Sequence, residues 1–206
     1  MGILKKITPP AFSAGVDEVG RGALAGPVLA GAVVFDPEIL ISGLKDSKKC
    51  SPRKRELLAR EIKKSALAWG IGSASSAEID SLNILRASHL AMQRAVAAMS
   101  FVPKCIYVEG HLVPEFDVPA FSVIKGDDRV DVISAGAIIA KVERDRIMRE
   151  LDIKHPGFGW SQNKGYPTKA HLQALVKNGP VADHRITFKP VKDNLTVGVQ
   201  STKRSS

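Results

Sequence analysis

Two apolar segments near the start of the chain, joined by a glycine-rich turn, constrain the fold more than any other feature. The first runs from Gly15 to Val19 and the second from Pro27 to Phe35. Apolar runs of this length on either side of such a turn are typical of a β-hairpin. The turn begins with Gly20-Arg21-Gly22, and two adjacent acids, Asp17 and Glu18, lie directly before it. A hairpin here would place both carboxylates at a strand end.

Further strands and helices alternate after the hairpin. Three short apolar runs predict strands from Ala66 to Ser73, from Cys105 to Val108 and from Phe121 to Ile124. Helical signals predict a helix that begins at Ser51-Pro52, a long helix that opens at Ser76, one from about Val130 to Leu151, and a short one from Thr168 to Val176. Residues 155–164 have the composition of a loop. This order predicts an α/β fold with a mixed central sheet flanked by helices and a C-terminal helical segment.

The length of 206 residues and the hydrophobic fraction of 44% favour one domain with an ample core. We expect that domain to cover residues 14–191, between an N-terminal extension, residues 1–13, and a polar tail, residues 192–206; the chain already becomes polar beyond Phe188. The sequence holds no apolar run as long as a membrane span and no signal-peptide pattern at its start. A cytoplasmic protein is expected, with Cys50 and Cys105 as reduced thiols.

The formal net charge of +9 favours an anionic partner. Nucleic acid comes first, because basic side chains displace counterions from phosphates. A cationic surface for membranes or for acidic proteins is the alternative, and charge alone does not decide between them.

Four acids fall near predicted strand ends: Asp17, Glu18, Glu109 and Asp127. Carboxylates are hard oxygen ligands that suit Mg²⁺ or Mn²⁺, and two such ions about 3.5–4 Å apart can hydrolyse a phosphodiester. Asp17 is our choice for the residue that bridges two ions. In a regular strand Asp17 and Glu18 point to opposite faces. Either the strand is bulged there, or Glu18 contributes through its backbone carbonyl.

Several motifs are similar to those of one protein family and follow that family's order. Besides residues 15–22 they are Asp46-Ser47-Lys48-Lys49, Ile79-Asp80 through Asn83-Ile84-Leu85 to Ala91-Met92, Lys125-Gly126-Asp127, Ile138-Ile139-Ala140-Lys141-Val142 with Arg144-Asp145, Lys164-Gly165-Tyr166-Pro167-Thr168, and His184-Arg185 with Phe188. Together they extend from about Ala14 to Val191. The chain therefore resembles type 2 ribonuclease H, in its bacterial form, ribonuclease HII.

The resemblance implies an RNase H-like fold and two-metal-ion hydrolysis of the RNA strand of RNA–DNA hybrids. It also implies nicking 5′ of single ribonucleotides embedded in duplex DNA, which leaves 3′-hydroxyl and 5′-phosphate ends and serves ribonucleotide excision repair and primer removal. The family's catalytic, metal-binding acids map onto Asp17, Glu18, Glu109 and Asp127. The implied cofactor is Mn²⁺ or Mg²⁺, and the implied partners are these duplexes, with no membrane, no evident protein partner and a monomer as the default.

The family's substrate-reading residues map onto the Gly20-Arg21-Gly22 loop and onto Tyr166, its junction-sensing tyrosine. Glycines let the backbone approach a ribose 2′-hydroxyl, and the tyrosine ring can pack against the neighbouring deoxyribose. Lys48 is expected to contact a phosphate, with a solvated basic face as an equal alternative. Lys141 and Arg144 are assigned to helix surface and left out of the site.

One departure concerns the catalytic acids, because the family usually has aspartate where this chain has Glu109. An added methylene moves the carboxylate by about 1 Å, and such a misplacement can lower a rate about 10²-fold. Either the surroundings absorb the longer side chain, or activity is weakened, or Mn²⁺ is preferred. A second hypothesis is therefore a catalytically impaired nucleic-acid-binding homologue. A third is a nuclease of the same fold that acts on another substrate, such as a Holliday junction.

Overall fold

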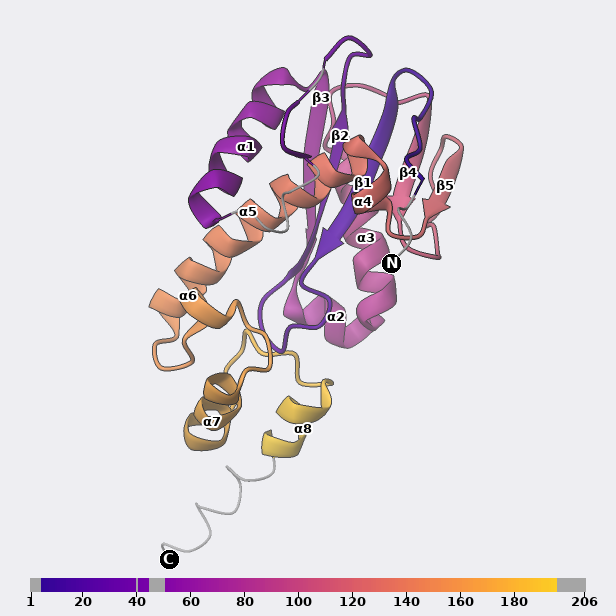
Figure 1. The fold of residues 1–206 in the computed structure, drawn as a ribbon. Coiled ribbons are helices and arrows are strands. Elements are labelled where there is room, and N and C mark those ends of the chain that lie inside the picture. Colours follow the sequence, from indigo (N-terminus) through magenta and orange to yellow (C-terminus); the bar gives the residue numbers. More distant parts are fainter. Residues whose placement is uncertain (1–4, 40, 45–50, 196–206) are drawn as a thin grey trace, which may run out of the picture. The chain divides into compact units, whose positions relative to one another are not determined.

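A five-stranded mixed sheet organises the part of the chain that the computed structural model describes, residues 5–39, 41–44 and 51–195 (Figure 1). Its strands are β1 (Ser13–Val19), β2 (Val28–Val34), β3 (Ala68–Ala74), β4 (Cys105–Glu109) and β5 (Ala120–Val123), in the order β3-β2-β1-β4-β5. Strand β1 pairs antiparallel with β2 and parallel with β4, and β4 pairs parallel with β5. The predicted hairpin and mixed sheet are confirmed.

The helices are α1 (Pro52–Ser65), α2 (Ser76–Leu82), α3 (Ile84–Ala97), α4 (Gly126–Arg129), α5 (Asp131–Lys154), α6 (Trp160–Asn163), α7 (Lys169–Asn178) and α8 (Lys189–Leu195). The chain divides into two compact units. Unit 1 holds most of the sheet and comprises Met1–Val19, Leu29–Ser73 and Ser88–Glu143. Unit 2 comprises Gly20–Val28, Ala74–Ala87 and Arg144–Ser206. Among the residues described, no helix is both long and apolar enough to cross a bilayer.

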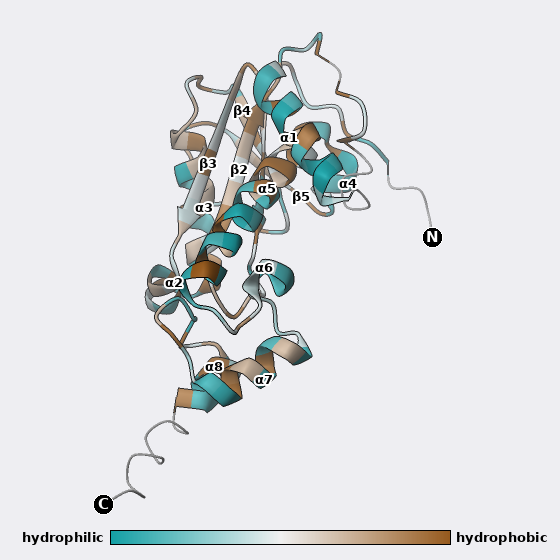
Figure 2. Cartoon of the chain, turned by 90° about the vertical axis from the view of Figure 1, so that its left-hand side faces the viewer, coloured by the Kyte–Doolittle hydropathy of each residue, from teal (hydrophilic) through white to brown (hydrophobic). Residues whose placement is uncertain are grey.

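Helices cover both faces of the sheet in unit 1 (Figure 2). Helices α1 and α5 pack on one face through a buried cluster that includes Val33, Leu58, Ile62 and Ile139. On the other face α3 lies so close to β3 that a side chain on Gly70 or Gly72 would overlap its backbone. Cys105 is buried with a free thiol, and Cys50 lies outside the described residues.

The helix that the sequence predicts from Ser76 as one continuous element is two helices. It begins with a capping box in which Ser75 and Glu78 bond each other's backbone N–H groups. The break is at Asn83, which has a positive φ of 71° and ends α2. The Asn83 side-chain oxygen then accepts hydrogen bonds from the backbone N–H groups of Leu85 and Arg86. Asparagine tolerates this conformation and caps the next helix, so the apolar spacing continues through the break.

Two short helices of unit 2 were not predicted. Helix α6 lies within the predicted loop 155–164, and α8 occupies the start of the predicted polar tail. Helix α6 is a single turn whose Trp160 is fully buried and stacks on Phe158. Helix α8 is anchored by Val191, which packs in a cluster with Leu24 and Leu175. In each of these two helices, one buried side chain fixes a segment that is too short to show a periodic apolar pattern in the sequence.

Two histidines of unit 2 are buried against each other. The Nε2 atoms of His171 and His184 lie 3.2 Å apart, and Trp160 Nε1–H donates to His171 Nε2 at 2.9 Å. The backbone N–H of Val181 donates to His184 Nδ1 at 3.0 Å. Burial, together with the neighbouring His171, lowers the pKa of His184 to about 4, and burial also lowers the pKa of His171. Both rings are therefore neutral at physiological pH.

This pair predicts a loss of stability in mild acid. Because the unfolded chain protonates His184 near pH 6.5 and the folded chain only near pH 4, stability is complete above pH 6.5 and falls progressively towards pH 4. After allowance for solvent screening we expect a loss of about 2 kcal/mol from this residue. Urea unfolding at a series of pH values measures the slope, and His184→Asn should flatten it. If the free energy of unfolding of that variant fell with pH as steeply as that of the wild type, His184 would not be the cause of the loss.

A second prediction concerns the contact between α5 and the hairpin. A side chain on Gly31 would overlap the carbonyl oxygen of Gly136. In the same way, a Cβ atom on Gly136 would lie 2.6 Å from the carbonyl oxygen of Gly31. We expect Gly31→Ala to cost about 1–3 kcal/mol through overpacking, a fall in Tm of roughly 2–10 °C. Gly136→Ala should cost less, because alanine favours a helix by about 1 kcal/mol. Thermal unfolding of both variants tests this, and an unchanged Tm for Gly31→Ala would contradict it.

Candidate active site

Three parallel strands of unit 1 bring the predicted acids to one edge of the sheet. Asp17 lies near the carboxyl end of β1 and Glu109 is the last residue of β4. Asp127 follows β5 and lies in the first turn of α4. Because β1, β4 and β5 are parallel neighbours, their carboxyl ends meet at the same edge. The topology thus gathers residues that are more than a hundred positions apart in the sequence.

Asp17, Glu18 and Glu109 each offer a carboxylate oxygen, and these oxygens all lie within 4.8 Å of one another. The strand is regular here, since Asp17 pairs with Gly31 and Glu18 with Ala30 without an extra residue on either side. Of the two alternatives left open for Glu18, the bulged strand is therefore wrong. Asp17 turns its carboxylate back to accept a hydrogen bond of 2.6 Å from the Glu18 N–H. Because Glu18 lies beyond the part of β1 that pairs with β4, its long side chain can reach the same place.

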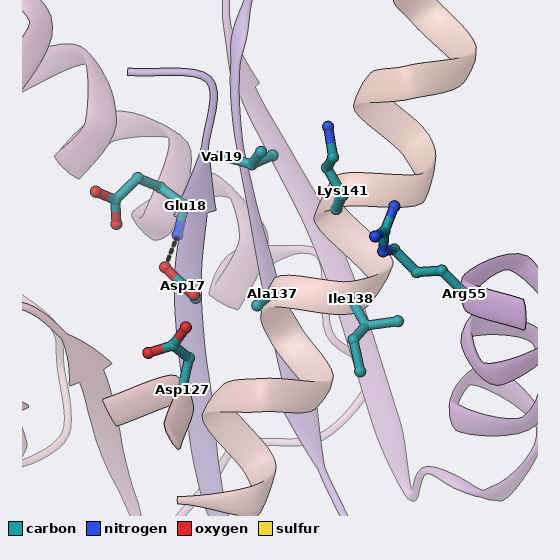
Figure 3. Close-up of a pocket in the computed structure, with 8 residues that line it drawn as sticks. All are labelled: Asp17, Glu18, Val19, Arg55, Asp127, Ala137, Ile138 and Lys141. Atoms are coloured by element: carbon teal, nitrogen blue, oxygen red, sulfur yellow. Dashed lines mark hydrogen bonds between the residues drawn. The ribbon is translucent and has the colours of Figure 1, made fainter. Parts of the chain in front are cut away.

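Asp127 is outside this three-residue group but lines the same cavity as Asp17 and Glu18. The cavity has a volume of about 350 Å³. In Figure 3 the carboxylates of Asp17 and Asp127 point towards each other, and Ala137 and Lys141 of α5 form the opposite wall. All four predicted acids therefore lie at one edge of the sheet, within unit 1.

Electrostatic repulsion is concentrated on Asp17. Its side chain is 8% exposed, and burial raises its pKa well above the usual range for aspartate. The nearby charges of Glu18, Glu109 and Asp127 raise the pKa further, against the smaller opposite effect of the Glu18 N–H. A buried carboxylate among three others is an unfavourable arrangement for the protein alone. A bound cation would relieve the repulsion.

The donor set fits a hard divalent ion. Three converging carboxylate oxygens are the ligand type that Mg²⁺ and Mn²⁺ prefer, and no thiol or imidazole belongs to the group. The open cavity beside them leaves room for water and a phosphate. These residues can therefore hold metal beside a substrate.

Two basic residues that were not predicted as part of the site line the same cavity. Arg55 extends from the first turns of α1, and Lys141 lies one turn beyond Ala137 on α5 (Figure 3). Lys141, which we left out of the site as a helix-surface residue, thus lines the cavity that holds the acids. Its spacing from Ala137 was an available signal, because residues four apart share one helix face. Residues 53–64 hold several lysines and arginines, and nothing in the sequence distinguishes Arg55 from the others.

The Gly-Arg-Gly loop and Tyr166 lie together in unit 2. A side chain on Gly22 would meet the Tyr166 ring at 4.0 Å, so the ring lies beside the bare backbone of the loop. Gly20 has a φ of 97°, a conformation that few residues other than glycine adopt. The loop and the tyrosine therefore form one surface. Lys48 lies outside the described residues.

Arg144 is not on the helix surface as predicted, because its side chain is completely buried. Its guanidinium donates to the carbonyl oxygens of Pro27 at 3.0 Å, Lys164 at 2.9 Å and Ala25 at 3.2 Å. An arginine on the polar side of a helix gives no sequence signal that loop carbonyls will surround it. Burial lowers its pKa, but the group is basic enough to keep its charge.

Comparison with known proteins gives consistent similarities. The profile of the family described as Ribonuclease HII matches residues 14–191. A ribonuclease HII of Shewanella halifaxensis is 50% identical over 202 residues, which covers 95% of this chain and 100% of that protein.

Solved structures are similar as well. The crystal structure of ribonuclease H2 from Pyrococcus horikoshii has a TM-score of 0.75 and 25% identity, covering 94% of this chain and 99% of that one. The structure of Bst-RNase HIII in complex with Mn²⁺ has a TM-score of 0.74 at 16% identity, covering 92% of this chain and 71% of that one, and supports the fold alone.

Proposed function

This chain belongs to the ribonuclease HII family and is thus a ribonuclease H, a metal-dependent hydrolase; from that premise we propose that it nicks duplex DNA 5′ of single embedded ribonucleotides. It also cleaves the RNA strand of RNA–DNA hybrids. The observation that carries the proposal is the convergence of Asp17, Glu18 and Glu109 at one sheet edge, beside a cavity lined by Asp127 and two basic side chains. The products are a 3′-hydroxyl and a 5′-phosphate.

Asp17, Glu18, Glu109 and Asp127 would hold two Mg²⁺ or Mn²⁺ ions. Asp17 would contribute most to holding them, because its carboxylate is close to the charges of the other three acids. Ions bound there supply Lewis acidity towards the scissile phosphate and the attacking water. That water adds to phosphorus while the bond from phosphorus to the upstream 3′ oxygen breaks, and the departing oxygen ends as a hydroxyl.

Arg55 and Lys141 hold the phosphate backbone at the cavity. Both line it together with the carboxylates, so a phosphate drawn to the acids through metal also meets two fixed positive groups. Arginine and lysine neutralise phosphate charge without reading sequence. They orient the strand and contribute little to the choice between ribose and deoxyribose.

The choice of sugar belongs to Gly20, Arg21, Gly22 and Tyr166. Bare backbone at the two glycines can hydrogen-bond a 2′-hydroxyl, and Arg21 can hold an adjacent phosphate. The Tyr166 ring beside Gly22 would pack on the next sugar, where a deoxyribose fits and a 2′-hydroxyl crowds. This arrangement favours a substrate strand in which a ribonucleotide is followed by a deoxyribonucleotide.

Cleavage of a DNA duplex with one embedded ribonucleotide tests the proposal. The duplex is incubated with the full chain and Mg²⁺, Mn²⁺ or EDTA, beside an all-DNA duplex of the same sequence. We expect one nick, 5′ of the ribonucleotide, with metal only and on the ribonucleotide substrate only. Binding without a nick in either metal would instead favour a nucleic-acid-binding homologue. Cleavage of the all-DNA control would point to another nuclease activity.

Removal of the Arg55 charge is expected to weaken substrate binding. Arg55→Gln should raise KM about tenfold, with a smaller change in kcat, and should reduce the salt dependence of binding by about one counterion. Lys64→Gln is the matched control, because Lys64 is exposed at the other end of α1 and loses the same charge. Equal effects of both substitutions would show that Arg55 acts only through the overall positive charge of the protein and does not contact a phosphate.

A further inference from the structure

Two buried polar groups of unit 2 contact Tyr166, one at its ring and one at its backbone. At the ring is Arg144 of α5, whose Cζ lies 5.5 Å from the centre of the tyrosine ring. At the backbone is His171 of α7, whose Nδ1 lies 3.0 Å from the Tyr166 carbonyl oxygen. Both side chains are completely buried. Neither belongs to the proposed substrate surface, so their effect on a substrate has to pass through the residues they contact.

Arg144 joins the loop of residues 20–27, between β1 and β2, to the segment that carries Tyr166. Two of its hydrogen bonds go to carbonyls of the loop, at Ala25 and Pro27, and the third goes to Lys164, two residues before Tyr166. A side chain on Gly20 would overlap the guanidinium, so the loop passes directly over it. The planar guanidinium can donate in several fixed directions at once. Together with the backbone hydrogen bond of 2.7 Å from the Leu24 N–H to the Gly165 carbonyl, this group holds the loop close to the ring.

Arg185 binds further carbonyls of the same loop. Its guanidinium, also completely buried, donates to the Gly26 carbonyl at 2.9 and 3.0 Å and to the Arg21 carbonyl at 2.9 Å. The two arginines thus bind four carbonyls of one loop, those of Arg21, Ala25, Gly26 and Pro27. The loop cannot move relative to Tyr166 unless these charge-assisted bonds break.

His171 fixes the backbone of the tyrosine. Because Trp160 Nε1–H can only donate, His171 Nε2 must accept, and the ring proton is then on Nδ1. Nδ1–H therefore donates to the Tyr166 carbonyl. The indole of Trp160 and the ring of His184 keep the histidine in this tautomer and orientation. The phenol ring is thus carried on a backbone that cannot rotate freely.

We propose that Arg144 and His171 are positioning residues that fix Tyr166 beside the Gly20–Gly22 loop, and that they thereby set the preference for a ribonucleotide–deoxyribonucleotide junction over continuous RNA. This inference rests on the proposed function. Discrimination by packing against a single hydroxyl requires a ring placed to within about 1 Å. Loosening either contact lets the ring withdraw. The junction then loses its advantage, while hybrid cleavage, which does not need the deoxyribose contact, is retained.

The test measures kcat/KM on a single-ribonucleotide duplex and on an RNA–DNA hybrid, and compares their ratio between variants. Arg144→Lys keeps the charge but loses the planar set of donors, and we expect the ratio to fall about tenfold while hybrid cleavage stays within about threefold. Arg146→Lys is the matched control, because Arg146 is half exposed on the same helix and pairs with Glu150. A ratio unchanged in Arg144→Lys, or lowered equally in the control, would overturn the role of Arg144.

Two substitutions of His171 separate its two contacts. The amide of asparagine can replace Nδ1 and keep the bond to Tyr166, whereas the longer glutamine can replace Nε2 and keep only the bond to Trp160. We expect His171→Gln to lower the ratio and His171→Asn to preserve it. The opposite order would show that packing with Trp160, and not the tyrosine carbonyl, accounts for the effect. This pair also decides the inference should Arg144→Lys fail to fold, as judged by thermal unfolding.

A double substitution shows whether the effect passes through the tyrosine. Tyr166→Ala should lower the ratio by itself, and adding Arg144→Lys should then change it no further, because the ring that Arg144 positions is gone. Additive losses would sink the positioning role. Failure of the wild-type chain to nick the single-ribonucleotide duplex would overturn the proposed function and this inference together. Normal nicking with a constant ratio would overturn this inference alone.

Discussion

Replacement of Asp17 by asparagine is expected to abolish strand cleavage and at the same time to make the metal-free protein more stable. The loss of rate should reach at least about 10³-fold, because a bridging metal ligand contributes several kcal/mol to stabilising charge in the transition state. Asparagine has nearly the same shape as aspartate, so the fold and the substrate surface stay intact. The variant should therefore bind duplex without cutting it.

The gain in stability follows from the electrostatics of the carboxylate cluster in the metal-free protein. Burial and the charges of Glu18, Glu109 and Asp127 raise the pKa of Asp17 well above its usual range, so the ionised side chain destabilises the fold at neutral pH. Asparagine removes that charge and can still accept the Glu18 N–H bond. We expect Tm to rise by a few degrees, roughly what 1 kcal/mol gives in a chain of this size. Function and stability then oppose each other at this residue.

Thermal unfolding with and without Mn²⁺ measures both effects. Metal at 100 times its dissociation constant should stabilise the wild-type protein by about 2.7 kcal/mol, whereas Asp17→Asn should show almost no shift. Asp128→Asn is the matched control, because Asp128 is an exposed acid on the same short helix as Asp127. It should keep the wild-type metal shift and rate. A normal Mn²⁺ shift in Asp17→Asn would remove Asp17 from the metal site.

The sheet and its carboxylates were predictable because the signals are local. Apolar runs of strand length with acids at their ends are visible along the chain, such as those before Glu109 and Asp127. Parallel pairing of these strands then brings their carboxyl ends, and so the acids, to one edge of the sheet. What the local pattern misses depends on partners far away in the sequence. Arg144 is buried only because carbonyls more than a hundred residues earlier surround it. Asn83 breaks a helix whose apolar spacing is uninterrupted.

The cationic part of the site was harder for a different reason. The sequence shows that a residue is basic but not where its side chain points in the fold. Nothing therefore indicates which of the many basic residues face the acids. Arg55 lines the cavity, whereas Lys64 of the same helix is exposed at its other end. Lys141 could have been placed by helical spacing from Ala137, once α5 was known to face the carboxylates. Orientation of a helix on a sheet is set by side-chain packing, such as the contact between Gly31 and Gly136.

Substitutions of Glu109, where the family resemblance leads us to expect aspartate, carry the second large effect. We expect Glu109→Gln to lower kcat about 10²-fold or more, because it removes one of the three gathered ligands. Glu109→Asp should lower kcat about tenfold and not raise it. The glutamate oxygen already reaches the other two carboxylates, so a shorter side chain withdraws it by about 1 Å.

The backbone cannot easily compensate for that withdrawal. Glu109 pairs in register with Val123 of β5, at the end of a regular parallel ladder, which holds its Cα in place. The measurement is kcat on a single-ribonucleotide duplex in Mg²⁺ and in Mn²⁺, with Glu115→Asp, an exposed glutamate shortened by the same methylene, as control. The loss in Glu109→Asp should be smaller in Mn²⁺ if that ion accepts the altered geometry more readily than Mg²⁺. A large gain in rate would instead mean that the native centre is impaired, and that nucleic-acid binding without efficient cleavage is the chain's activity.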